Sequence, residues 1–466
     1  MTTTNTTDRT STTDALRKGL KGKLVLPGEP SYDAARSVYN AMIDKRPAAI
    51  VECADGGDVA RAITFARDSG LAAAIRGGRH SGGGFGTCDG GVVIDLTALR
   101  AIEVDPSART VRVEGGATWG EVDKATHAHG LAVPCGVIST TGVGGLTLGG
   151  GHGYLTRKYG LTVDNLIAAE VVLADGRKVH ANAKENADLF WALRGGGGNF
   201  GVVTAFHFKA HPVHTVIGGP MIWPLADAPE VMKFYLQETA DAPDDVYGFF
   251  ATMTVPPGPP FPEPLHLTKV CGIVWCFTGG AEQAEAVLGR FRRFKAPAAD
   301  FVGPIPMPAL NGLFDALYPS GLQWYWKGDF FEKVDPTAIA LHLKYSEQLP
   351  TMHSAMHLYP IDGAAARVGE ADTAWGHRRA KFSEVIVGVD PEPVNAGRIR
   401  SWARDYWMAL HPHSSGAAYV NFMMADEGDE RVRATYGANY QRLAQVKHKY
   451  DPNNLLRVNQ NILARG

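Results

Sequence analysis

The stretch RGGRHSGGGF, residues 76–85, places five glycines within ten positions, and the fold prediction begins there. Glycine has no Cβ, so a glycine-rich backbone can approach a ligand closely and present several N–H groups to one anion. Further glycine clusters occupy residues 142–160 and 195–201. One cluster is often only a tight turn, but three within one half of the chain predict a cradle for phosphate.

Two common nucleotide motifs do not explain these clusters. Residues 196–201, GGGNFG, satisfy the pattern G-x-G-x-x-G, but a predicted helix precedes them and a predicted strand follows. The dinucleotide fingerprint requires the opposite order, with the strand first. The pattern G-x-x-x-x-G-K-[ST] occurs nowhere in the chain, which excludes a P-loop.

The residues around the glycine clusters predict a compact α+β unit. Short apolar runs and clean alternation predict strands, while apolar residues at helical spacing predict helices. Strands are expected at residues 48–53, 72–75, 92–96, 110–114, 167–173 and 202–210, and helices at 57–69, 119–130 and 188–194. The glycine clusters fall in the loops between these elements.

Length and composition limit the possible functions. At 466 residues the chain is long for one core, which predicts two domains and room for an enclosed site. With 20% charged residues and a formal net charge of −2, neither nucleic acid nor an anionic membrane is favoured as a partner. The N-terminus lacks the features of a signal peptide, and no apolar run is long enough for a membrane span.

The cysteines follow no pattern of a metal site or a disulfide framework. There are five of them: Cys53, Cys88, Cys135, Cys271 and Cys276. An odd number without ligand spacing predicts reduced thiols, as in a cytoplasmic protein. His353 and His357 are four residues apart, but their segment is predicted to be a strand and no carboxylate completes a ligand set, so no metal is expected.

Residues 76–85 resemble the pyrophosphate loop of bacterial berberine-bridge-enzyme-like oxidases, a branch of the vanillyl-alcohol-oxidase superfamily with a PCMH-type FAD-binding domain. The usual run in that family is R-[SG]-G-G-H-[SND], and its histidine is bonded to the 8α-methyl group of the flavin. The resemblance therefore implies covalent FAD at His80. Arg79 replaces the usual glycine, and an arginine at this position is also able to contact phosphate.

The resemblance extends over essentially the whole chain. Segments 142–165, 191–201 and 451–462 match the second flavin loop, the third flavin loop and the closing segment of the family. Val143 matches a position near the reactive edge of the flavin, where valine resembles the oxidase type. The cofactor-binding residues that the resemblance implies are His80, Arg76, Gly77, Gly78, Arg79, Ser81, Gly82, Val143, Gly144, Gly145, Gly149, Gly150, Gly153, Tyr154, Asn199, Gly201, Val202, Asn459 and Gln460.

Many relatives hold the flavin by a second bond, from a cysteine four residues before the first glycine of the second loop. Counting back from Gly142, that position is Ile138, and Cys135 lies three residues further upstream. The resemblance therefore implies attachment through His80 only, with Cys135 as a small buried residue. Double attachment through Cys135 would require a shift of the loop and stays open as an alternative.

The expected fold class is α+β, with a two-subdomain PCMH-type FAD-binding domain and a separate substrate domain built on an antiparallel sheet. Composition changes near residue 216, where glycines become fewer and prolines and aromatics more frequent. The FAD-binding domain is expected over residues 14–215 and the substrate-binding domain over 216–410. Residues 411–466 are expected to return to the FAD domain, and residues 1–13 to form a disordered tail.

The resemblance implies oxidation of a small-molecule alcohol, amine or sugar by hydride transfer to flavin N5, with O₂ reduced to hydrogen peroxide. Three alternatives stay open. The enzyme could be a dehydrogenase with another acceptor or a ring-forming oxidase of secondary metabolism, or the chain could bind flavin and ligand without turnover. The sequence determines neither the substrate nor the oligomeric state.

The base that would accept the substrate proton is expected among Tyr419, Tyr325 and Glu384, in that order. Many plant relatives have a tyrosine at the position of Phe422, so that role does not carry over. Each candidate also has a structural interpretation, since Tyr419 and Tyr325 fit a core and Glu384 fits a solvated surface. Several other aromatics fit either a core or a substrate site: Trp324, Trp326, Tyr359, Trp375 and Trp407.

Overall fold

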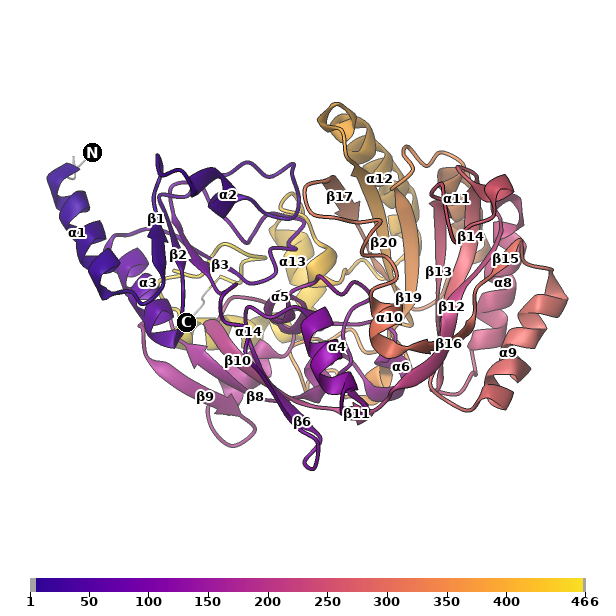
Figure 1. The fold of residues 1–466 in the computed structure, drawn as a ribbon, viewed down its shortest axis with the longest axis horizontal. Helices are drawn as coiled ribbons and strands as arrows, with labels where there is room; N and C mark the ends of the chain where they lie inside the picture. Colours follow the sequence, from indigo (N-terminus) through magenta and orange to yellow (C-terminus); the bar gives the residue numbers. More distant parts are fainter. Residues whose placement is uncertain (1–5, 464–466) are drawn as a thin grey trace.

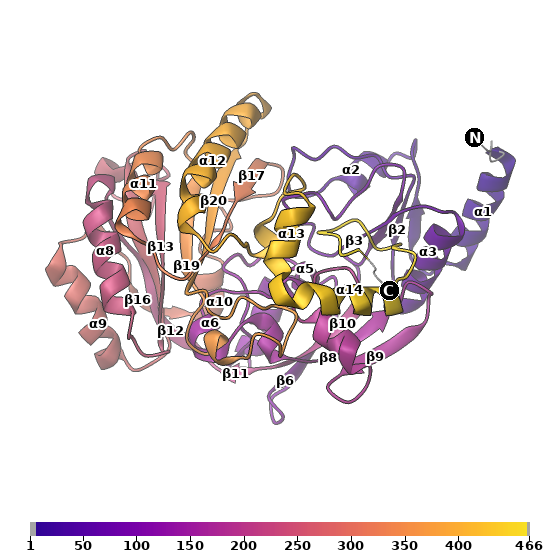
Figure 2. The same cartoon turned by 180° about the vertical axis from the view of Figure 1, so that it is seen from behind.

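The computed structural model describes residues 6–463 and arranges them around three main sheets (Figure 1). Two smaller sheets come from the first half of the chain. A large antiparallel sheet follows, and the last helices return to the smaller sheets, as Figure 2 shows from behind. The α+β class with antiparallel sheets, predicted from the sequence, is confirmed.

The first sheet has the strand order β1-β2-β4-β3. Its members are β1 (Lys23–Val25), β2 (Ala49–Glu52), β3 (Ala73–Arg76) and β4 (Val92–Asp95). β4 pairs in parallel with β2 and with β3, and helix α3 (Gly56–Asp68) crosses between β2 and β3. The Asp55 side chain caps α3 by accepting hydrogen bonds from the N–H groups of Gly57 and Asp58. The first glycine cluster therefore begins where the parallel strand β3 ends.

The second sheet is antiparallel, with the strand order β5-β6-β10-β8-β9. Its members are β5 (Ile102–Asp105), β6 (Thr110–Glu114), β8 (Leu166–Val172), β9 (Lys178–Asn182) and β10 (Val202–Lys209). Phe206 and Phe208 of the central strand are fully buried in its core. The second and third glycine clusters connect elements of this sheet, so both are fixed to its rigid core.

The third sheet is built around the strand order β12-β14-β13-β19-β20-β17. These strands are β12 (Thr215–Pro224), β13 (Val246–Thr254), β14 (Lys269–Phe277), β17 (Gln323–Lys327), β19 (Ala355–Pro360) and β20 (Phe382–Asp390), with β15 (Ala299–Asp300), β16 (Gly303–Pro306) and β18 (Phe330–Phe331) at its margins. Helices α8 (Ala228–Thr239), α9 (Ala281–Phe294), α11 (Pro336–Ser346) and α12 (Ala396–Leu410) cover one face (Figure 1).

The opposite face of the third sheet is also buried. All nine residues of β20 are buried, and successive side chains alternate between two cores. Ile386 packs with the covering helices, whereas Val385 and Val387 pack with Trp324 and Tyr359 on the other face. This second face is the one that meets the glycine loops.

The remaining elements are short or C-terminal. They are α1 (Thr6–Gly19), α2 (Tyr32–Arg36), α4 (Trp119–His127), β7 (Leu131–Ala132), α5 (Val143–Leu148), α6 (Thr156–Tyr159), α7 (Ala187–Leu193), β11 (His211–Pro212), α10 (Met307–Asn311), α13 (Asp429–Tyr436) and α14 (Tyr440–Tyr450). The spacing after residue 430 predicts one helix. The structure divides it into α13 and α14 at Gly437, whose φ of 50° interrupts a right-handed helix.

The N-terminus differs from its prediction. Helix α1 begins at Thr6, within the segment 1–13 for which a disordered tail was expected, and residues 1–5 lie outside the described part. Leu16 near the end of this helix is buried in the core around α3, which holds the helix to the first sheet. Arg17 and Lys18 lie in its last turn, where the helix dipole favours positive charge.

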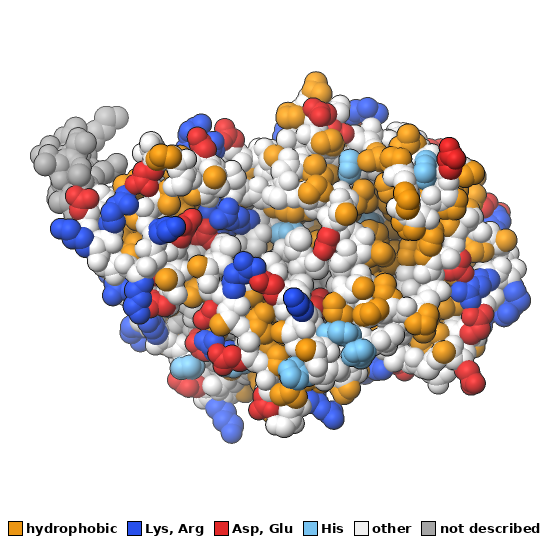
Figure 3. Space-filling view, viewed as in Figure 1, with side chains coloured by type: hydrophobic (Ala, Val, Ile, Leu, Met, Phe, Trp, Pro, Cys, Tyr) orange, Lys and Arg blue, Asp and Glu red, His pale blue; other side chains and the backbone are white. Residues whose placement is uncertain are grey.

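Two surface properties accompany this fold. Acidic and basic side chains are interspersed over the face seen in Figure 3, without a large patch of one sign. Within residues 6–463, no helix combines the length and the apolar character that crossing a membrane would need.

A buried lysine fastens the C-terminal segment to the third glycine cluster. The Lys447 ammonium group donates to the Asp451 carboxylate at 2.7 Å, to the Asn199 carbonyl at 2.9 Å and to the Leu456 carbonyl at 3.0 Å. Its side chain is fully buried, as is that of Asp451. Removing one partner of such a pair leaves the other charge buried without compensation.

We expect Lys447→Leu to lower the free energy of unfolding by about 3 kcal/mol, because the Asp451 carboxylate and two carbonyl groups lose their donor. The measurement is the thermal midpoint of the purified protein. The matched control is Lys449→Met, since the Lys449 side chain is 59% exposed and its pair with Asp188 contributes little. Equal midpoints for the two variants would contradict the role given to Lys447.

Candidate functional site

One cavity of about 370 Å³ lies where the three glycine clusters meet the third sheet and the C-terminal segment. The glycines that line it are Gly77, Gly78, Gly86, Gly115, Gly136, Gly142, Gly144, Gly145, Gly197, Gly198 and Gly201. Glycine backbone therefore forms much of one wall. The opposite wall carries large aromatic side chains from β17 and β19.

The first two glycine clusters cross in direct backbone contact. A Cβ atom added to Gly78 would lie 2.4 Å from the Gly142 nitrogen, and one added to Gly77 would lie 2.6 Å from the Gly115 carbonyl oxygen. No other residue type fits such a distance. The crossing sets the position of the loop that follows, residues 79–86.

A buried ion pair anchors the start of this loop. Arg76 is buried and contacts the Asp95 carboxylate at 2.7 Å, and Arg79 reaches the same carboxylate at 3.0 Å. Arg79 adopts a φ of 63°, a conformation that favours glycine, the residue that the family pattern has at this position. One nitrogen of the Arg76 guanidinium, Nη1, is buried without a hydrogen-bond partner at the cavity wall. That nitrogen is a donor available to an anionic ligand.

His80 lies at the cavity with its ring stacked on Tyr39, at a centroid distance of 3.9 Å and an interplanar angle of 20°. Burial lowers the pKa of the His80 imidazole to about 4, although a hydrogen bond with the Thr140 backbone favours the charged form. The ring is therefore neutral at neutral pH and keeps a lone pair on one nitrogen. A neutral, stacked imidazole is suited to form a covalent bond to an electrophilic carbon.

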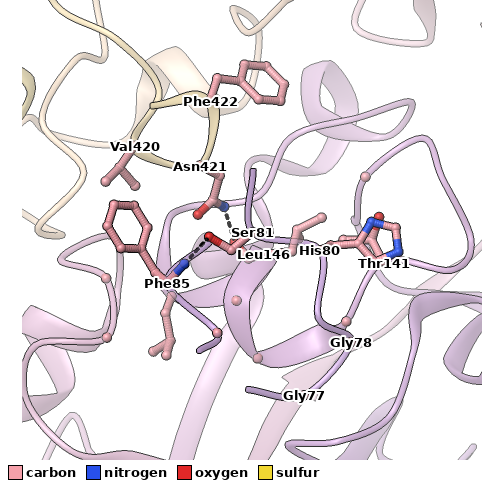
Figure 4. A pocket seen from close by; sticks show the side chains of 18 of the residues that line it. Gly77, Gly78, His80, Ser81, Phe85, Thr141, Leu146, Val420, Asn421 and Phe422 are labelled. Carbon is pink, nitrogen blue, oxygen red and sulfur yellow. Dashed lines mark hydrogen bonds between the residues drawn. The ribbon is translucent and has the colours of Figure 1, made fainter. Parts of the chain in front are cut away.

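The C-terminal segment closes over the second glycine cluster, as Figure 4 shows for Asn421 and Leu146. The Asn421 amide donates to the Leu146 carbonyl at 3.1 Å and to the Tyr419 hydroxyl oxygen at 2.7 Å. The Gly151 N–H donates to the same hydroxyl oxygen at 2.9 Å. A Cβ at Gly149 would lie 2.3 Å from the Asn421 side chain, so the glycine makes room for this contact.

The C-terminal segment also meets the third cluster. The Asn199 amide donates to the Gln460 carbonyl at 3.2 Å, and its oxygen accepts from the Ile462 N–H at 3.0 Å. Gln460 in turn donates to the Met424 carbonyl at 2.9 Å. Residues separated by about 260 positions in the chain thus share one wall of the cavity.

The third sheet supplies the remaining wall, together with side chains from the second cluster and the C-terminal segment. We call this part of the cavity the aromatic chamber, lined by His152, Phe314, Tyr318, Trp324, Trp326, His357, Tyr359, Val385, Val387, Tyr419 and Phe422. His357 Nδ1 and the Tyr359 hydroxyl are hydrogen bonded at 2.6 Å.

Of the three predicted bases, the structure brings Tyr419 to the cavity and places the other two away from it. Tyr325 lies on the opposite face of β17 from Trp324 and Trp326, and its hydroxyl donates to Asp426 at 2.8 Å. Glu384 lies on the helix-covered face of β20, 3.7 Å from His342. Glu384 is fully buried, whereas the structural interpretation expected it on a solvated surface. Both placements follow from the alternation of side chains along a strand.

The predicted cofactor residues divide into two groups. Twelve line the cavity: His80, Arg76, Gly77, Gly78, Arg79, Ser81, Gly144, Gly145, Asn199, Gly201, Asn459 and Gln460. The structure does not place Gly82, Val143, Gly149, Gly150, Gly153, Tyr154 or Val202 among the lining residues. The glycines of this second group make room for protein atoms. At Gly82, for example, an added Cβ would lie 2.1 Å from the Trp326 ring.

Several residues at the cavity were missed by sequence reasoning. Tyr39 precedes the first cluster by nearly forty residues, and no local pattern marks it. His357 lies on β19 at the cavity, but its spacing from His353 suggested only a metal site. His152 lies inside the second cluster, in GGGHG, and its position between glycines could have identified it as a residue of the site.

The cysteines and histidines show no other arrangement for a cofactor. Cys135 is buried beside Asn311, at 3.1 Å from its amide nitrogen, and does not line the cavity, whereas Ile138 does. Burial raises the pKa of the Cys135 thiol well above its usual value. Within residues 6–463, no three or more His, Cys, Asp or Glu side chains form a group able to hold a metal ion.

Comparisons with known proteins agree with this geometry. An FAD binding domain model matches residues 47–182, and a berberine and berberine-like model matches residues 418–463. An FAD-linked oxidoreductase of Dictyostelium discoideum is 32% identical over 91% of this chain and 90% of its own.

Two solved structures extend the comparison. The crystal structure of 6-hydroxy-D-nicotine oxidase from Arthrobacter nicotinovorans has a TM-score of 0.85 at 26% identity, covering 95% of this chain and 98% of its own. A glucooligosaccharide oxidase from Acremonium strictum, with a 6-S-cysteinyl, 8α-N1-histidyl FAD, has a TM-score of 0.83 at 23% identity, covering 97% and 98%.

The residues at the cavity fit an FAD. The glycine wall allows close approach of a pyrophosphate, and the unpartnered Arg76 Nη1 is a donor for it. The Asn459 side-chain oxygen is a buried acceptor without a partner in the same wall. His80 lines the same cavity as this wall and the aromatic chamber, so its imidazole is available to hold the flavin.

We expect Gly78→Ala to lower the free energy of unfolding by about 1–3 kcal/mol and to reduce bound flavin, because the added methyl group forces the two loops apart. The measurements are the thermal midpoint and the flavin content per chain. Gly397→Ala is the matched control, since a Cβ at this α12 glycine meets nothing within 4 Å. If Gly78→Ala behaves like Gly397→Ala, the loop crossing does not constrain the site.

Proposed function

Because the chain belongs to the berberine-like family of FAD-linked oxidoreductases, we propose that it oxidises a small-molecule alcohol, amine or sugar with FAD bonded to His80. O₂ is the proposed electron acceptor and hydrogen peroxide the second product. Membership of this family establishes that the chain is an FAD-dependent oxidoreductase. The observation that supports covalent attachment is the half-buried, neutral imidazole of His80 at the cavity.

Attachment through His80 alone is the form of the cofactor that we propose. The Tyr39 ring stacks on the imidazole and restricts its rotation, and both side chains line the cavity. Cys135 makes its contacts with Asn311, away from the lining residues, and its thiol has a raised pKa that disfavours the reactive thiolate. The doubly attached flavin of the glucooligosaccharide oxidase is a property of that enzyme.

The domain roles are also part of the proposal. The glycine walls come from residues 14–215 and the C-terminal segment from residues 411–466, which together would hold FAD. The sheet between residues 216 and 410 contributes the aromatic wall opposite and would bind the substrate. A flavin held between the two would be exposed to substrate only from the chamber side.

When bound, the flavin supplies the acceptor for the substrate hydride. The residues of this chain position the substrate and exclude water. Tyr419 contributes through its hydroxyl, whose oxygen accepts hydrogen bonds from Gly151 and Asn421. Burial raises the pKa of this phenol to about 12, although both hydrogen bonds lower it. It is therefore protonated at neutral pH, and we propose that Tyr419 fixes the Gly151 loop and donates its own proton in a hydrogen bond.

Phe422 in place of a tyrosine keeps the alternative of a flavin-binding protein without turnover under consideration. A protein of that kind would retain the FAD but would not be reduced by any small molecule. An aerobic panel of alcohols, amines and sugars with peroxide detection separates the two functions. Peroxide release above the free-FAD background supports the oxidase, and a flavin that stays reduced in the presence of O₂ without releasing peroxide supports a dehydrogenase.

We expect acid precipitation of the purified protein to leave the yellow colour in the pellet, because the proposed bond from His80 survives denaturation. In His80→Ala the colour is expected in the supernatant, since this variant keeps the glycine cradle but lacks the bonding nitrogen. The measurement is the flavin absorbance of both fractions.

The matched control is His129→Ala, an exposed histidine outside the cavity, which is expected to behave like the wild type. Colour released from the wild type would overturn covalent attachment. Colour retained by both wild type and His80→Ala would point to another attachment site and bring Cys135 back into consideration.

A further inference from the structure

His152 is an unpartnered polar side chain inside the aromatic chamber. The residue is only 6% exposed, and both ring nitrogens are buried without a hydrogen-bond partner. In a buried imidazole at least one nitrogen normally has a hydrogen-bond partner, since leaving a buried polar group unpaired costs about 1–3 kcal/mol. Because the ring lines the cavity, the missing partner is best supplied by a ligand there.

The surroundings of His152 are aromatic on three sides. Its ring centroid lies 4.6 Å from that of Tyr419, 5.2 Å from that of Tyr359 and 5.5 Å from that of Phe422. These neighbours come from the C-terminal segment and β19, whereas His152 belongs to the second glycine cluster. His152 thus stands where the glycine wall meets the wall of the third sheet.

The hydroxyl oxygens next to His152 already take part in hydrogen bonds with other residues. The Tyr419 oxygen accepts two hydrogen bonds, from Gly151 and Asn421. The Tyr359 hydroxyl is paired with His357 at 2.6 Å. Burial lowers the pKa of His152 to about 3, so its ring is neutral at neutral pH and one nitrogen is a free acceptor.

The chamber offers no charge to a substrate. Among the residues that line the cavity, the Lys, Arg, Asp and Glu side chains comprise only Arg76 and Arg79. Both lie in the first glycine cluster and pair with Asp95. The walls of the chamber are instead flat rings, including Trp324 and Trp326. A charged ligand would lose its hydration there without gaining a partner.

We propose that His152 is the hydrogen-bond acceptor for the substrate, and that the substrate is a flat, uncharged molecule that carries a hydroxyl or N–H group. The inference rests on the proposed oxidase function and names the substrate class for that site. It excludes oligosaccharides, which need many polar partners, and anionic substrates, which need a cation in the chamber.

The test uses the flavin-loaded protein and four probes: 2-naphthol, naphthalene, 2-naphthoate and cellobiose. Dissociation constants come from the change in the visible absorption of the flavin. We expect 2-naphthol to bind about 10-fold more tightly than naphthalene, the effect of one buried hydrogen bond. 2-Naphthoate is expected to bind more weakly than 2-naphthol, and cellobiose to produce no change.

In His152→Phe the preference for 2-naphthol over naphthalene is expected to disappear, while naphthalene binding stays similar, because the ring is kept and its nitrogens are lost. His152→Gln, which keeps an acceptor, is expected to retain part of the preference. The matched control is Phe422→Leu, which removes aromatic contact without removing an acceptor. It is expected to weaken both probes equally and preserve their ratio.

Three outcomes would overturn the inference. The first is a preference for 2-naphthol that persists in His152→Phe. The second is tightest binding by cellobiose or 2-naphthoate. The third is a flavin absorption that none of the aromatic probes changes. Loss of flavin in both His152 variants would also overturn it, since His152 would then be a cofactor contact. Each result is distinguishable from failure of the proposed function, because oxidation is read from the peroxide panel and covalent attachment from the acid precipitation of wild type and His80→Ala.

Discussion

The contact between the backbones of Gly78 and Gly142 is the constraint on which the site depends. Two loops that are more than sixty residues apart approach so closely that a Cβ on either glycine would lie 2.4 Å from a backbone nitrogen. This crossing fixes the loop that carries His80 against the loop that leads to His152. The buried Arg76–Asp95 pair holds the base of the crossing, because a buried charge tolerates little displacement from its partner.

The third sheet turns this cradle into an enclosed site. β20 is buried on both faces, so its odd and even residues serve different cores. Val385 and Val387 face the cavity, while Glu384 faces the helices. The C-terminal segment completes the enclosure, since Lys447 fastens it to Asn199 and Asn421 meets the second glycine cluster. The walls proposed for the flavin and for the substrate are therefore made by distant parts of the chain.

The sequence predicted much of the fold and the part of the site made by glycine loops. The strands at 92–96 and 110–114 and the helix at 57–69 lie within about one residue of β4, β6 and α3. The FAD-linked oxidoreductase family, inferred from residues 76–85 and the later motifs, is confirmed by the comparisons. Of the predicted base candidates, only Tyr419 reaches the cavity.

What the sequence determined by itself is local: glycines mark where backbone must approach closely, and apolar periodicity marks strands and helices. Only the tertiary structure decided which face of β17 and β20 meets the cavity, because each strand carries aromatic or aliphatic side chains on both faces and alternation alone leaves two choices. It also decided that His152 has no partner while Tyr359 and Tyr419 do. The hydrogen bond from Gly151 to Tyr419 joins segments that come together only when the chain is folded, so no local pattern could show it.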